Sequence, residues 1–87
     1  MEKAALRLKV TVGTVKKVAD NEGNIYSEEL SFNAVYSNEP GSANAQWSKW
    51  TPSASLSMTI NNPAAFGKVL PGQFFFVDLI PTTRESI

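Results

Sequence analysis

The most regular feature of the chain is an alternation of apolar and polar residues from position 53 to position 60. Ala54, Leu56, Met58 and Ile60 are separated by serine or threonine at every intervening position. Because neighbouring side chains of a β-strand point to opposite faces of its sheet, this pattern predicts a strand with one core-facing row and one outward polar row.

Two earlier segments show the same alternation. Residues 6–12 have leucine or valine at every even position, and residues 27–36 also place their large apolar residues mainly at even positions. Gly13 breaks the phase of the first segment, because the next valine stands three residues after the last one, and this slip predicts a β-bulge. The turn-forming residues 20–24 between the two segments predict a hairpin.

The fourth predicted strand, residues 73–80, differs because both of its faces carry apolar side chains. Such a strand is either covered on both faces or presents one apolar row to another molecule. We expect a short helix and the tryptophan segment to cover part of the second face and a subunit contact to cover the rest. One face would carry Phe75, Val77 and Leu79, and the other Phe74, Phe76, Ile80 and the charged Asp78.

The connecting segments contain one candidate helix. Residues 37–46 have almost no apolar bulk and predict a long exposed loop that leads to the two tryptophans. Asn62 is a good capping residue and Pro63 suits the first helical position, which predicts one or two helical turns before the turn at Pro71 and Gly72.

Together these elements predict an all-β fold. We expect a small antiparallel barrel or sandwich of four to five strands, with one short helix before the last strand. Residues 1–81 would form a single β domain, and residues 82–87 would form an exposed C-terminal tail.

Composition narrows the function classes. The 87 residues contain no cysteine and no histidine, so the chain lacks disulfides, thiolate metal ligands and the usual neutral-pH acid-base catalyst. We therefore expect a protein that is not an enzyme and that holds no cofactor or metal. No run of 18 apolar residues predicts a membrane span, and the charged amino terminus does not resemble a signal peptide, which favours synthesis and retention in a cytoplasm.

The net charge is zero, but the charges are unevenly distributed. Residues 1–17 have a net charge of +4, whereas residues 20–39 contain five acidic residues and no basic one. One interpretation is a hairpin whose basic strand pairs with an acidic strand. The other is a dipolar subunit that docks its basic edge on the acidic edge of the next copy.

Trp47 and Trp50, with Lys49 between them, are the main candidate binding residues. They could plug an open barrel end, form a protein interface, or stack on bases or a sugar. The neutral charge and the acids of the hairpin oppose phosphate contacts, so we disfavour nucleic acid and favour a cap or protein contact. The candidate interface comprises Trp47, Lys49, Trp50, Phe74, Phe76, Arg7 and Lys9.

Other chemistry finds little support in the sequence. The acidic turn overlays on the rear of an EF-hand loop, but Val18 stands where the first carboxylate belongs and the flanks predict strands, so an acidic hairpin turn explains it better. Serines such as Ser55 and Ser57 have no histidine to activate them. Asp78 would carry a raised pKa if it were buried, and an outward position that blocks edge pairing is the preferred interpretation.

Two segments carry a family resemblance. The sequence from Trp47 to Ala64, WSKWTPSASLSMTINNPA, and that from Pro71 to Pro81, PGQFFFVDLIP, resemble small uncharacterised proteins of tailed bacteriophages and prophages. The resemblance covers roughly the last 40 residues and implies a phage origin. It leaves two natural classes, a virion component such as a capsid decoration protein and an accessory protein that acts in the infected cell.

The expectation that joins these points is a non-enzymatic phage structural protein. It would be a capsid decoration or cement subunit, made in the host cytoplasm, located in the virion and acting through contacts with capsid or other virion proteins, as a homo-oligomer and without a membrane. The alternative is an intracellular accessory module, either an OB-like binder of single-stranded nucleic acid or a counter-defence protein that sequesters a host factor or a nucleotide.

Overall fold

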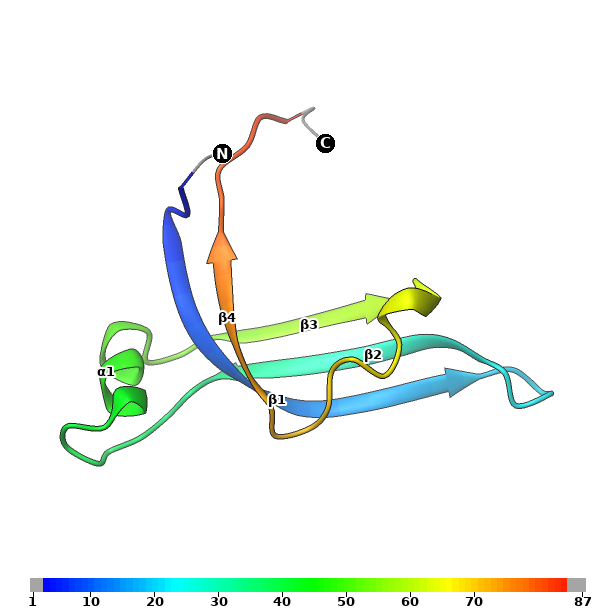
Figure 1. Ribbon diagram of the computed structural model, residues 1–87, viewed down its shortest axis with the longest axis horizontal. Helices are drawn as coiled ribbons and strands as arrows, with labels where there is room; N and C mark the ends of the chain where they lie inside the picture. The colour runs from blue at the N-terminus through cyan, green and yellow to red at the C-terminus, as the bar shows by residue number, and fades with distance from the viewer. Residues whose placement is uncertain (1–2, 85–87) are drawn as a thin grey trace.

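A computed structural model describes residues 3–84 of the chain. Four strands form one sheet, and one α-helix and one 3₁₀ turn lie in the connections (Figure 1). In chain order the elements are β1 (Leu6–Ala19), β2 (Ile25–Ala34), α1 (Ala43–Trp50), β3 (Ser55–Ile60), η1 (Pro63–Ala65) and β4 (Phe74–Leu79).

The sheet has the order β3-β2-β1-β4, and every neighbouring pair is antiparallel. The long strand β1 is shared between two partners. Its first part pairs with β4, from Leu6 to Thr11, and its second part pairs with β2, from Val10 to Ala19. Consequently the sheet has two legs, an upright one of β1 and β4 and a horizontal one of β1, β2 and β3 (Figure 1).

The predicted bulge at Gly13 is confirmed. The register between β1 and β2 shifts between Val12 and Thr14, which leaves Gly13 as the additional residue. A Cβ atom at Gly13 would stand only 3.2 Å from side-chain atoms of Ser31 and Asn33, so a larger residue would crowd the bulge. Because a bulge bends its strand and increases the local twist, it helps to turn β1 from one leg into the other.

The two faces of the sheet differ sharply. The apolar face contains the core, and the loop 61–73 crosses this face. Val69 of the loop packs against the core, and the backbone N–H of Gly67 donates to Glu28 Oε2 at 3.1 Å. The polar face contains the serine and threonine row of β3 and most of the charged residues of the strands. The buried core residues are Leu8, Val10, Val12, Leu30 and Phe32.

The predicted barrel or sandwich is wrong, although the all-β prediction with four antiparallel strands holds. Within residues 3–84 the strands form a single open sheet, with β3 and β4 as its two edges. Closure would require these edges to meet, but the bend of β1 directs β4 along the upright leg, away from β3 (Figure 1).

The helix prediction is also wrong in position. The α-helix lies between β2 and β3, in the segment predicted as an exposed loop, and Ser42 caps it by accepting a hydrogen bond from the Ala45 N–H at 3.0 Å. Before the last strand there is only the single turn η1, even though Asn62 caps it as expected. Gly67 follows with a φ of +78°, a left-handed conformation that ends helical structure.

The charge pattern of the hairpin is explained by register. Lys16 lies opposite Glu29, with 3.9 Å between Nζ and Oε2, and Lys17 lies opposite Glu28. The basic and acidic segments therefore do pair across this hairpin. Of the predicted C-terminal tail, residues 82–84 are exposed, and residues 85–87 lie outside the described residues.

The chain is extended for its size. Its radius of gyration is 15.7 Å, whereas a compact domain of this length has about 12 Å. Its accessible surface is 6754 Å², against about 5,000 Å² for a compact monomer of the same mass. An isolated copy therefore leaves a large area uncovered.

Candidate protein-binding surface

The candidate interface residues of β1 and β4 gather on the polar face of the upright leg. In the register of this strand pair, Arg7 lies opposite Asp78 and Lys9 lies opposite Phe76. Phe74 follows on the same face of β4, because side chains two positions apart on a strand point to the same side. Two cationic and two aromatic side chains thus meet on a surface of regular backbone.

Arg7 and Asp78 form a bidentate ion pair. Arg7 Nε donates to Asp78 Oδ1 at 2.6 Å and Arg7 Nη2 donates to Oδ2 at 2.9 Å. The hydrogen bond from Arg7 holds the pKa of Asp78 below its ordinary value, and the same hydrogen bond raises the pKa of Arg7. Asp78 is not buried, so its pKa moves in the direction opposite to the one that burial would produce.

The two cations also lie against aromatic rings. The guanidinium carbon of Arg7 is 5.3 Å from the centre of the Phe76 ring, and Lys9 Nζ is 5.2 Å from the centre of the Phe74 ring. Cations at this distance over a ring face are attracted by its quadrupole, typically by about 0.5–1 kcal/mol at exposed sites. The contacts hold the two phenylalanine rings in place while they remain about half exposed, at 54% and 56%.

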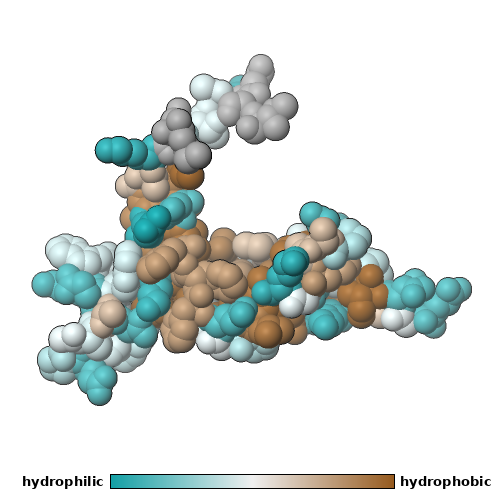
Figure 2. Space-filling view, in the orientation of Figure 1, coloured by the Kyte–Doolittle hydropathy of each residue, from teal (hydrophilic) through white to brown (hydrophobic). Residues whose placement is uncertain are grey.

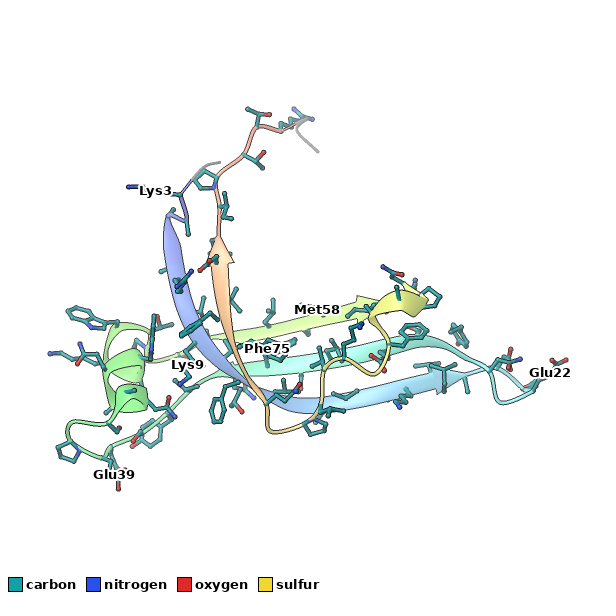
Figure 3. The ribbon with its side chains drawn as sticks, viewed as in Figure 1. Lys3, Lys9, Glu22, Glu39, Met58 and Phe75 are labelled. Atoms are coloured by element: carbon teal, nitrogen blue, oxygen red, sulfur yellow. The ribbon has the colours of Figure 1, made fainter. Side chains whose placement is uncertain are left out.

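Helix α1 extends this surface. Lys9 Nζ donates to Asn44 Oδ1 at 2.7 Å, so β1 is tied to the first turn of the helix, beside which Lys9 appears in Figure 3. One turn later the Trp47 ring lies 5.3 Å from the Phe76 ring, with the planes tilted by 51°. We call the resulting group the aromatic patch, and it comprises Arg7, Lys9, Trp47, Phe74 and Phe76.

The remaining two candidate residues pair with each other at the end of α1. Lys49 Nζ is 5.4 Å from the centre of the Trp50 ring, and Trp50 is 69% exposed. The idea that the tryptophans plug an open barrel end is wrong, because the sheet is not closed. Trp47 instead contacts the outer face of β4, and Trp50 points away from the core.

Sequence reasoning missed Asn44, because it assigned the segment before the tryptophans to a loop. The available signal was Ser42 followed by the helix-compatible residues 43–46, which is the pattern of a capped helix without a large apolar stripe. With this helix in place, Lys9 and Asn44 become neighbours, although 35 positions separate them in the chain.

The electrostatics of the patch favour a binding surface over a catalytic site. The guanidinium of Arg7 is hydrogen-bonded to Asp78, and the ammonium of Lys9 is hydrogen-bonded to Asn44. Both cations therefore already have polar partners, and they serve to orient the rings. Within residues 3–84 there is no cluster of three or more potential metal-ligating side chains. Nor does any helix in this part of the chain have the length and apolarity to cross a membrane.

A polar groove lies on the horizontal leg. Thr14 Oγ1 and Ser31 Oγ are 2.6 Å apart, and they border an open groove of about 470 Å³ together with Lys16, Glu29 and the outward serine and threonine row of β3. The groove is shallow and its charges pair across it, so it lacks the convergent polar groups of a small-molecule site.

The sequence matches no family model, no curated protein and no solved structure. The chemistry of the patch therefore carries the functional argument.

Proposed function

We propose that the protein is a non-enzymatic structural protein of a tailed phage, a capsid decoration or cement subunit that docks through the aromatic patch. The observation that carries this proposal is the half-exposed pair Phe74 and Phe76, held by cations on a rigid strand. In an 87-residue chain, large aromatic side chains that remain exposed provide apolar area that a partner can bury.

The composition of the patch suits a protein partner. Tryptophan and arginine are enriched among residues that dominate the energy of protein interfaces. Rings fixed by neighbouring contacts lose little conformational entropy on binding, so more of the buried area is available as affinity. The ion pair of Arg7 and Asp78 gives the patch a directional polar contact at its rim.

The assignment to a phage rests on the resemblance of residues 47–64 and 71–81 to phage and prophage proteins. These same segments contribute the partly buried Trp47 and the exposed Trp50, Phe74 and Phe76. A decoration subunit bound in many copies needs a preformed docking surface of this kind.

The test is to find the chain in virions and to measure its docking. Mass spectrometry of purified virions should detect it in hundreds of copies, and the purified protein should sediment with assembled capsids. Phe74→Ala should release it from capsids, whereas Tyr26→Ala, an exposed aromatic of the β1–β2 hairpin, should not. A chain that is absent from virions and fails to bind capsids would refute the proposal.

One feature also favours a second candidate, a binder of single-stranded nucleic acid. Exposed rings at alternate positions of a strand, flanked by Arg7 and Lys9, form the stacking surface that such binders use. Titration of the tryptophan fluorescence with oligonucleotides at low and high salt separates the two candidates. Quenching that weakens steeply with salt supports nucleic acid, because phosphate contacts release counterions.

A further inference from the structure

We propose that the apolar face of the sheet is closed by the same face of a second copy, so that the functional unit is a two-fold dimer with a shared core. This inference goes beyond the docking proposal, because it concerns the face opposite to the aromatic patch. It begins from the incomplete cover of the core.

The loop 61–73 covers only part of the apolar face. Two adjoining apolar hollows remain open, of about 260 Å³ and 170 Å³. Both are lined by Leu56 and Val77, and Val69 of the loop lines the larger one. Large apolar side chains around them stay exposed, including Met58 on β3 and Leu79 on β4, at 38% and 52%. Figure 2 shows the hydrophobic surface running from the horizontal leg onto the upright leg.

The distribution of charge on the strands indicates what covers this face. Of the charged strand residues, only Lys17 and Glu28 share the apolar face, and Glu28 is fully buried. The other charged residues point to the polar face: Arg7, Lys9, Lys16, Glu29 and Asp78. The strands of an identical face can therefore approach without opposing like charges at its centre, provided that the exposed Lys68 of the loop 61–73 lies beside the contact.

The exposed area is large enough for a contact with a second copy. The chain exposes roughly 1,700 Å² more than the 5,000 Å² or so of a compact monomer, given its accessible surface of 6754 Å². Standard interfaces bury about 800 Å² per partner, and permanent homodimers bury more and resemble a domain core cut in half. The excess is thus sufficient for a permanent dimer.

The apolar face lies across both legs, from Leu8 and Val77 on the upright leg to Leu30 and Met58 on the horizontal leg. Two copies that meet over the part of this face left open by the loop 61–73 would form two layers, as in a sandwich. The sandwich that the sequence suggested for one chain would then be formed by two.

Neighbouring residues of β3 provide a matched test. Met58 points to the apolar face and Ser57 to the polar face, and both are exposed in the single chain. Sedimentation equilibrium of the wild type should give twice the 9.5 kDa mass of the chain. Met58→Lys should weaken the dimer about 100-fold or more, because it buries an unpaired charge, and Ser57→Lys should leave the dimer unchanged.

Circular dichroism of each variant verifies the fold. If Met58→Lys fails to fold, Leu79→Lys repeats the test at a half-exposed position on the other leg. A wild type that stays monomeric at 100 μM or so overturns the proposal. So does a dimer that Ser57→Lys disrupts while the apolar-face variants leave it intact, or native mass spectrometry that finds one chain with a bound lipid. The capsid-binding assay with Phe74→Ala is independent, so failure of the docking proposal leaves this test intact.

Discussion

The bidentate pair of Arg7 and Asp78 is the residue-scale feature with the clearest consequence for pH. The hydrogen bond from Arg7 lowers the pKa of Asp78 below 3.8, its ordinary value, in the folded state. A carboxyl with a depressed folded pKa contributes stability above its unfolded pKa and loses that contribution as the pH falls through the folded pKa. Stability from this pair is therefore complete above about pH 5 and declines below pH 4 or so.

We predict that Asp78→Asn removes part of the acid sensitivity. The melting temperature of the wild type should fall between pH 5 and pH 2.5 or so, and that of the variant should fall less. The backbone N–H groups of Asn24 and Glu22 also lower the pKa of Asp20. Asp20 should therefore account for a separate part of the acid sensitivity. An NMR titration offers the direct check, since Arg7→Gln should raise the pKa of Asp78. Identical acid curves for wild type and Asp78→Asn would contradict the assignment.

Trp50 offers a second prediction at the residue scale. Because its ring is 69% exposed and contacts the neighbouring Lys49, Trp50→Ala should change the free energy of unfolding by less than about 0.5 kcal/mol. Trp50 lies outside the aromatic patch but on the same helix as Trp47. If the docking surface extends along this helix, the same change should weaken capsid binding by about 2 kcal/mol or more, the usual effect of removing a dominant interface residue.

The two effects of Trp50→Ala are measured by urea unfolding and by capsid co-sedimentation. Trp47→Ala is the informative comparison, because Trp47 also contacts Phe76 within the fold and its removal should affect both quantities. Unchanged capsid affinity in Trp50→Ala would exclude Trp50 from the docking surface.

At the scale of elements, sequence reasoning succeeded where the signal was local and periodic. The alternation of β3 and the phase slip at Gly13 depend only on side-chain direction, and both appear in the structure. Helix α1 was missed because it has no buried residue, so no apolar periodicity marks it. Closure of the sheet could not be predicted, because it depends on how far β1 bends and not on any one segment.

A buried side chain of β2, Glu28, ties the middle of the loop 61–73 to the sheet. Glu28 is fully buried, and its Oε2 accepts the hydrogen bond from Gly67 N–H, while its Oε1 has no hydrogen-bond partner among the described residues. Removing one partner of a hydrogen bond made by a buried group costs about 1–3 kcal/mol, whereas an exposed ion pair such as that of Lys16 and Glu29 contributes about 0–1 kcal/mol.

We predict that Glu28→Ala destabilises the protein by about 2 kcal/mol and loosens the loop. Trypsin should then cleave after Lys68, an exposed residue of this loop, more rapidly than in the wild type. The adjacent Glu29→Ala is the matched control, because Glu29 points to the polar face and makes only the 3.9 Å ion pair with Lys16. Equal cleavage rates in the two variants would show that Glu28 does not hold the loop.

At the scale of the whole molecule, the extended shape links stability to association. A chain of this size with a radius of gyration of 15.7 Å has few buried residues to offset the conformational entropy of folding. If the apolar face is completed by a second copy, much of the core forms only in the dimer, and folding is coupled to association.

This coupling predicts a melting temperature that depends on protein concentration. Because a dimer gains stability by mass action, the wild type should melt several degrees higher at 100 μM than at 1 μM or so, and Ser57→Lys should behave in the same way. Met58→Lys should melt lower, with little dependence on concentration, because a charge at this position disfavours the contact between apolar faces. Differential scanning calorimetry over this range measures the effect. A wild-type melting temperature that is independent of concentration would show that the single bent sheet is stable without a second copy.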